Sequence, residues 1–328
     1  LWLPTPGCAG RRAAAMGQRG RTRGPGERCK DEPAEGPVLP QHLPQEPHAS
    51  ANAPPRARPL ADALPDEFQR EVVLPYDQTL HPFGDALNQV LGEGPGADLG
   101  QLHVTGRGRE VIGAFQRRPK EVVTLGPRDN PWNRRYHACA QVDPAAFSRF
   151  MAVYHEFLRS FVLQDLRTDR VAFQASPTFR CHLPWCGAPG RPHRDEDYRH
   201  PRCEVNYWIP LTAVFGSNSL YAESRRDACD FRPFELSPGA LVRFYGNQVW
   251  HYTIPNETDC TRVSIDFRVI REQEWSIATF SDFQLGAYYA VMTRSGVLPY
   301  KSPEIRALQE EFQCVPPPKK MKGKGAAA

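Results

Sequence analysis

The sequence predicts a mainly β protein with flanking helices, whose core is an antiparallel sandwich or a closed barrel. After about residue 170, many short strand-like segments follow one another, with turn residues between them and no helical pattern. One helical pattern with a broad apolar face precedes them, at 144–161. The chain has 328 residues, which suffices for one domain of about 250 residues and additional segments.

The two ends of the chain differ in composition from its body. Residues 1–60 contain 11 Pro and 7 Gly, and residues 316–328 join three Pro to four Lys. Such segments cannot bury enough apolar surface to offset the conformational entropy lost on folding. We therefore predict a disordered Pro/Gly/Arg-rich segment at 1–60, a folded domain at 61–315 and a disordered basic tail at 316–328.

The formal net charge of +4 comes from these ends, because residues 61–315 hold 28 basic and 32 acidic residues. We expect no nucleic-acid partner for such a body, and no membrane span, since no run of 18 apolar residues occurs. Nine cysteines without a C-x-x-C pair favour a reduced, intracellular protein. The location stays open between the cytoplasm, which we favour, and an organelle, because arginines precede any acid. The oligomeric state is not predicted.

The helix at 144–161 is predicted from its beginning and its spacing. Asp143 before Pro144 makes a pair of N-cap and first helical residue. The apolar positions that follow at helical spacing are Phe147, Phe150, Met151, Tyr154, Phe157, Leu158 and Phe161. We expect this aromatic face to pack against a sheet. Between 61 and 142, short apolar runs alternate with Gly and Pro, and we predict only a mixed α/β flank.

The strands of the predicted core are short and regularly interrupted. They are expected at 171–175, 178–183, 203–211, 219–223, 231–236, 240–245, 249–254 and 261–270. After them we predict a helical C-terminal extension that covers the barrel, with aromatic and apolar residues at Trp275, Phe280, Phe283, Leu285, Tyr288 and Tyr289.

A candidate metal site begins at His193-Arg194-Asp195. Two residues apart on an extended strand, the imidazole and the carboxylate would point to the same side. His251, on another predicted strand, supplies a third ligand. Two His and one carboxylate form the set that leaves positions open on non-haem Fe(II). Asp197 has the same parity and is an alternative if the strand bulges. A zinc site is disfavoured, because the cysteine and histidine spacings near residues 181–203 match no usual framework.

The strand predicted after His251 alternates strictly between polar and apolar residues. Arg262, Ser264, Asp266 and Arg268 share one face, which could be merely solvated. Because Arg262 follows His251 by 11 residues, however, the strand can return beside the metal ligands. A guanidinium is the natural bidentate partner of a carboxylate. A metal beside an anchored carboxylate suggests a 2-oxoacid cosubstrate.

In this order, these residues resemble the Fe(II)- and 2-oxoglutarate-dependent oxygenases. Residues 174–270 are similar in particular to the streptomycin-biosynthesis-type hydroxylase group, near the phytanoyl-CoA hydroxylase-like enzymes. The stretches that carry this similarity are Pro177 to Pro184, Asp195 to His200, Asn206 to Thr212, Gly216 to Leu220 and Arg262 to Ile270. The resemblance implies a double-stranded β-helix (jelly-roll, cupin-like) core at about 170–272, inside an oxygenase domain at 61–315.

The resemblance also implies roles for individual residues. Fe(II) would be bound by His193, Asp195 and His251, and 2-oxoglutarate by Arg262 and Ser264. Asn206 would contact the cosubstrate or a metal-bound oxygen, although a purely structural role in its strand is equally compatible with the pattern. The cofactors implied are Fe(II), 2-oxoglutarate and O₂.

The function implied is a dioxygenase that hydroxylates a C–H bond of a small polar metabolite and releases succinate and CO₂. The subgroup suggests a sugar or an aminocyclitol-type compound. Because Asp195 is present, the halogenase variant that lacks this carboxylate is not indicated. The alternative is a catalytically silent cupin-like barrel that binds a metal or a sugar.

Overall fold

The computed structural model describes residues 64–116, 130–277 and 284–311. The predicted segments 1–60 and 316–328 lie outside the described residues, as do Phe280 and Phe283 of the predicted extension.

The described part of the chain consists of a helix-rich segment before residue 166 and a strand-rich segment after it. The helices are α1 (Asp66–Gln69), α2 (Phe83–Leu91), α3 (Gly106–Gln116), α4 (Pro131–Val142), α5 (Pro144–Phe157), α6 (Leu163–Asp165) and α7 (Pro303–Glu311). The strands are β1 (Val72–Pro75), β2 (Arg170–Gln174), β3 (Thr178–His182), β4 (Val205–Pro210), β5 (Tyr221–Ala222), β6 (Arg232–Pro233), β7 (Ala240–Phe244), β8 (His251–Tyr252), β9 (Arg262–Arg271), β10 (Tyr289–Thr293) and β11 (Gly296–Val297).

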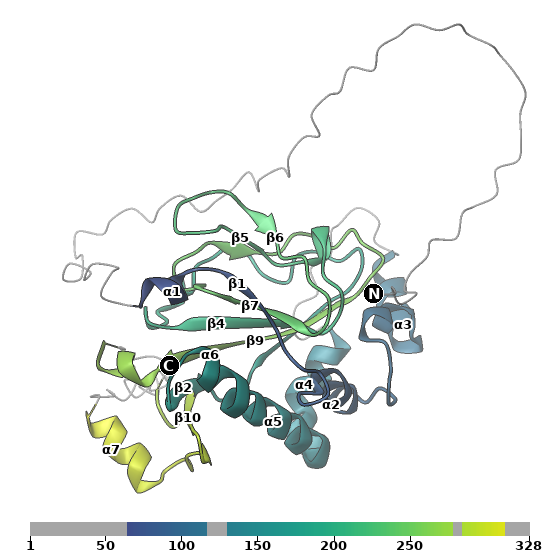
Figure 1. Cartoon of the computed structure of the whole chain (residues 1–328). Helices are drawn as coiled ribbons and strands as arrows, with labels where there is room; N and C mark the ends of the chain where they lie inside the picture. Colours follow the sequence, from purple (N-terminus) through teal and green to yellow (C-terminus); the bar gives the residue numbers. More distant parts are fainter. Residues whose placement is uncertain (1–63, 117–129, 278–283, 312–328) are drawn as a thin grey trace, which may run out of the picture. The chain divides into compact units, whose positions relative to one another are not determined.

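Two antiparallel sheets form the jelly roll. The larger sheet has the order β1-β7-β4-β9-β2-β10-β11, with β3 also paired to β9, and the smaller sheet has the order β6-β5-β8. Figure 1 shows α2, α4 and α5 on one side of the larger sheet and the strands β5 and β6 on the other. The predicted mainly β fold with flanking helices is confirmed, and all eight strands predicted between 171 and 270 are present within a few residues of their expected bounds.

Strand β9 is the central strand of the larger sheet. It pairs with β4 along one edge and with β3 and then β2 along the other. Val263, Ile265, Phe267 and Val269 belong to the main hydrophobic core. The alternating residues Arg262, Asp266 and Arg268 line a pocket on the opposite face. The alternation in the sequence therefore separates a packed face from a functional face.

Helix α5 covers the packed face, as its aromatic pattern predicts. Asp143 caps the helix by accepting a hydrogen bond from the backbone N–H of Ala146 (3.1 Å). The ring of Tyr154 meets Phe267 edge-on, with 5.0 Å between ring centroids. Phe157 also contacts Phe267. These fully buried rings pack α5 against the apolar face of the larger sheet.

The C-terminal part differs from the prediction. Tyr289 lies in β10, which adds to the edge of the larger sheet and pairs with β2, so it is not part of a helix. The helix of this region, α7, begins only at Pro303. Short strands with apolar residues on both faces do not alternate, and adjacent aromatics such as Tyr288 and Tyr289 fit either structure. The four-residue strand β1 was likewise not predicted individually.

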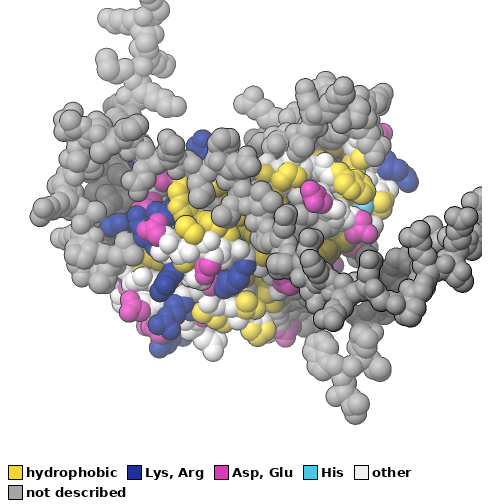
Figure 2. All heavy atoms as spheres, turned by 90° about the horizontal axis from the view of Figure 1, so that it is seen from above, with side chains coloured by type: hydrophobic (Ala, Val, Ile, Leu, Met, Phe, Trp, Pro, Cys, Tyr) yellow, Lys and Arg dark blue, Asp and Glu magenta, His cyan; other side chains and the backbone are white. Residues whose placement is uncertain are grey.

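The surface of the described part carries charges of both signs. On the face shown in Figure 2, Lys and Arg side chains lie among Asp, Glu and apolar side chains. None of the helices in the described ranges has the length and apolar composition needed to cross a membrane. Five of the described cysteines, Cys139, Cys181, Cys186, Cys203 and Cys229, are free thiols.

Candidate metal centre

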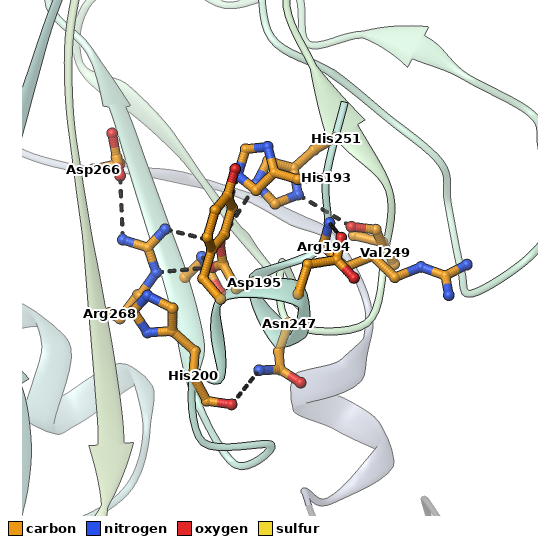
Figure 3. Close-up of polar contacts among 12 residues, drawn as sticks. His193, Arg194, Asp195, His200, Asn247, Val249, His251, Asp266 and Arg268 are labelled. Carbon is orange, nitrogen blue, oxygen red and sulfur yellow. Dashed lines mark hydrogen bonds and ion pairs between the residues drawn. The ribbon is translucent and has the colours of Figure 1, made fainter. Parts of the chain in front are cut away.

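The two candidate histidine ligands come from segments that pair with each other. His251 opens β8 in the smaller sheet, and His193 lies in a loop that forms a single antiparallel bridge with it. Each backbone N–H of the pair bonds to the other residue's carbonyl, at 3.2 and 3.0 Å. This bridge holds the imidazole rings side by side, with centroids 4.3 Å apart (Figure 3).

Asp195 completes the cluster from the beginning of a short 3-10 helix, Asp195–Tyr198. The expectation that His193 and Asp195 share an extended strand is therefore wrong in its local detail. The two side chains still converge, because Oδ1 of Asp195 lies 3.7 Å from Nε2 of His193 and 3.8 Å from Nε2 of His251. The described residues form one potential metal-binding group of this kind, and it consists of these three. The alternative ligand, Asp197, instead accepts a hydrogen bond from the backbone N–H of Arg194.

Both imidazoles are oriented with Nε2 toward the cluster. Nδ1 of His193 lies 2.8 Å from the carbonyl oxygen of Arg191, and Nδ1 of His251 lies 3.1 Å from that of Val249. Backbone acceptors at these positions fix the tautomer that carries its proton on Nδ1. Burial, reinforced by His193, lowers the pKa of His251 to about 4. The ring is therefore neutral at physiological pH, which is the form that binds a metal.

The carboxylate of Asp195 is held by two buried side chains. Arg268 donates from Nε to Oδ2 (2.8 Å) and from Nη2 to Oδ1 (2.9 Å) (Figure 3). The amide nitrogen of Asn206 also donates to Oδ2 (2.7 Å). Burial raises the pKa of Asp195, but Arg268 and His251 outweigh it, so the pKa lies well below its usual range. Arg268 thus keeps the buried carboxylate of this candidate ligand ionised and oriented.

Replacing Arg268 with methionine should destabilise the metal-free protein strongly. The substitution leaves the buried charge of Asp195 without its counter-ion, which typically costs about 3–5 kcal/mol. Urea unfolding in the presence of a chelator measures this loss. A bound divalent cation compensates the same charge, so added metal should raise the stability of Arg268→Met more than that of the wild type.

A matched control is Arg294→Met, because Arg294 pairs with Asp169 on the exposed surface and exposed pairs contribute little. The role assigned to Arg268 would be contradicted if metal-free Arg268→Met were as stable as the wild type. It would also be contradicted if the variant were less stable and added metal did not reduce that difference.

Arg262 and Ser264 form a second polar group on the same face of β9. The side chain of Arg262 is only 1% exposed, and its Nε and Nη1 atoms have no hydrogen-bond partner among the described residues. The same is true of the Ser264 hydroxyl. Burial, with Arg180 nearby, lowers the pKa of Arg262 to about 10, so the group stays charged at neutral pH. An unpaired buried guanidinium is costly, and an anionic carboxylate would satisfy both groups. The residues present therefore fit 2-oxoglutarate beside a metal.

Other polar residues of the core separate into two groups. Arg180 and Asn206 line the pocket. Arg243 instead forms a buried ion pair with Asp165 at 2.7 Å. Asn218 accepts from the backbone N–H of Phe215 and therefore stabilises a turn.

The support that Arg268 gives to Asp195 was missed at the sequence level. The alternation of Arg262, Ser264, Asp266 and Arg268 was a signal for its position on the pocket face. Its partner could not be inferred, because the two residues are 73 positions apart in the sequence.

The fold and the site together define a class of protein. A jelly roll that carries His-x-Asp and a distal His, with a buried arginine eleven residues further on, fits the Fe(II)- and 2-oxoglutarate-dependent oxygenase superfamily that the sequence resembles.

Comparison with characterised sequences identifies a relative of this chain. The streptomycin biosynthesis protein StrG of Streptomyces griseus is 31% identical over an alignment of 223 residues that covers 66% of this chain and 96% of StrG. The chain therefore belongs to the StrG family. No model of a protein family matches it.

Solved structures with a similar chain course are more distant. They include a non-heme monooxygenase, ThoJ, in complex with Ni (13% identity, 78% of this chain and 94% of that chain, TM-score 0.33). The carbocyclase SnoK from nogalamycin biosynthesis matches at 14% identity over 64% and 85% of the two chains, with a TM-score of 0.36. EvdO2 from Micromonospora carbonacea, complexed with 2-oxoglutarate, matches at 17% over 62% and 87%, with a TM-score of 0.32.

Proposed function

We propose that this protein hydroxylates a C–H bond of a small polar metabolite, using Fe(II), 2-oxoglutarate and O₂ and releasing succinate and CO₂. The observation that carries the proposal is the placement of the buried Arg262, whose Nε and Nη1 atoms have no hydrogen-bond partner among the described residues, in the same pocket as His193 and His251 of the three-residue cluster. A barrel that only binds a metal has no use for such an arginine.

The residues of the chain divide the work between them. His193, Asp195 and His251 would hold the metal, and Arg268 and Asn206 keep Asp195 oriented. Arg262, with the hydroxyl of Ser264, would bind the distal carboxylate of 2-oxoglutarate. The bound iron would supply the oxidation of the C–H bond, coupled to decarboxylation of the cosubstrate.

The pocket wall also has an apolar side. Trp208, Leu220 and Phe244 line it together with the histidines. Apolar walls exclude water from a reactive centre and strengthen the electrostatic contacts inside it. The name of the relative StrG refers to the biosynthesis of streptomycin, which supports a sugar or an aminocyclitol-type metabolite as substrate. The free thiols of Cys139, Cys181, Cys186, Cys203 and Cys229 support an intracellular location.

The test starts with spectroscopy under anaerobic conditions. Purified protein with Fe(II) and 2-oxoglutarate should develop a weak visible charge-transfer band, and admission of air should yield succinate. A panel of small metabolites is then screened for compounds that accelerate succinate formation. Correctly folded protein that gives neither the band nor succinate would be a silent barrel, which is the alternative.

A further inference from the structure

The pocket would keep an excess of positive charge even with a metal and the cosubstrate bound. Its lining contains four arginines, Arg180, Arg191, Arg262 and Arg268, and one acid, Asp266. Two further acids lie within ion-pair distance of Arg268, namely the candidate metal ligand Asp195 and Glu204 (3.9 Å). Four guanidinium groups therefore face three carboxylates, which leaves a formal surplus of one positive charge. A divalent metal and the dianion 2-oxoglutarate cancel each other, so the surplus persists in the loaded site.

Two of these arginines already have a role. Arg268 is bound in a bidentate manner to Asp195, and Arg262 is assigned to the cosubstrate. The surplus therefore belongs to Arg180 and Arg191.

Arg180 is only partly neutralised. It lies on β3 opposite Ser264 of β9, and its Nε atom is 3.3 Å from Oδ1 of Asp266. The other oxygen of Asp266 lies 3.6 Å from Nη1 of Arg268. One carboxylate is therefore shared between two guanidinium groups. The side chain of Arg180 is 38% exposed, so a ligand in the pocket can reach it.

Arg191 lies at the exposed rim of the pocket, two residues before the metal ligand His193. It donates from Nε to the hydroxyl of Tyr198 (3.3 Å) and its guanidinium lies over that ring, 6.0 Å from the centroid. No described carboxylate lies within ion-pair distance of it, although Asp197 acts on it at longer range. The ring holds the guanidinium in place without neutralising it.

We propose that the metabolite hydroxylated at this site is an anion, whose carboxylate or phosphate group is bound by Arg180 and Arg191. This inference rests on the proposed function and names the substrate class for it. Guanidinium groups are well suited to both anions, because their planar donors match paired oxygens. The two arginines would orient the neutral remainder of the substrate toward the metal.

Manganese provides a direct test, because Mn(II) binds similar ligands and its paramagnetism broadens NMR signals of nearby nuclei. Protein loaded with Mn(II) and saturated with 2-oxoglutarate is titrated with inorganic phosphate, observed by ³¹P NMR, and in a separate arm with acetate, observed by ¹H NMR. We expect saturable broadening in the millimolar range for at least one probe. The phosphate arm distinguishes a phosphate ester substrate from a carboxylate.

Arg180→Gln and Arg191→Gln should each lower the affinity for the anion by about tenfold and leave the affinity for 2-oxoglutarate unchanged. Arg306→Gln is the matched control, since Arg306 is an exposed arginine of α7 outside the pocket, and it should behave as wild type.

The proposal is overturned if 2-oxoglutarate binds but neither anion produces saturable broadening. It is also overturned if Arg180→Gln and Arg191→Gln leave the broadening unchanged. Failure of 2-oxoglutarate to bind the wild type would instead refute the proposed function, so the two failures are distinguishable.

Discussion

Replacement of His251 with alanine is expected to abolish iron binding while the protein stays folded. His251 supplies one of three ligand atoms that lie within 4.8 Å of one another. Even residues that merely orient a metal ligand typically change affinity by about 10–100-fold, so loss of a ligand should cost roughly a hundredfold or more. The backbone bridge between His193 and residue 251 needs no side chain and should survive. Anaerobic titration with Fe(II) measures the affinity.

His137→Ala serves as the control for this experiment, because His137 is an exposed histidine of α4. It removes an imidazole without touching the cluster and should bind iron as the wild type does. Wild-type affinity in folded His251→Ala would show that the metal, if bound, lies elsewhere.

Replacement of Arg262 with glutamine is expected to separate the cosubstrate from the metal. Iron affinity should be retained, because none of the three ligands contacts Arg262 through a hydrogen bond. The affinity for 2-oxoglutarate should fall by about 3 kcal/mol, or roughly a hundredfold, because a buried, charge-assisted contact is lost. The charge-transfer band, followed as 2-oxoglutarate is added to the iron-loaded variant, reports this affinity directly.

Arg243→Gln is the matched control for Arg262→Gln. Arg243 is also a buried arginine of the larger sheet, but its guanidinium pairs with Asp165 outside the pocket. Its loss should reduce the stability of the protein and leave the cosubstrate affinity unaltered. Equal loss of iron and 2-oxoglutarate in Arg262→Gln would refute the assignment of separate roles.

The strands of the core could be predicted because their sequence pattern is local. The alternation in β9 and the Pro, Gly and Asn residues between strands are visible without knowledge of the fold. For β10 this was not possible, because Tyr289, Ala290, Val291 and Met292 are all buried. A strand covered on both faces has no period of two, so its sequence does not distinguish it from a helix.

The candidate site divides in the same way. The order of His193, Asp195, His251 and Arg262 could be recognised from spacing and from resemblance, and the structure brings the first three together. Two other features depend on tertiary contacts and could not be predicted: the 3-10 helix that begins at Asp195, and the bidentate ion pair of Arg268 with the Asp195 carboxylate. The surplus charge at Arg180 and Arg191 could not be predicted from the sequence, because only the fold brings β3 and the loop before His193 to the same pocket.

The two-faced strand β9 also has a consequence for folding. A shift of its pairing by one residue would turn Arg262 and Arg268 into the aromatic layer beneath α5 and would expose Phe267 between the sheets. The cost of burying two guanidinium groups among apolar rings excludes that register. The arginines that we assign to binding the cosubstrate and to orienting Asp195 thus also help to specify the strand register. Only the correct pairing keeps their charges out of the apolar core.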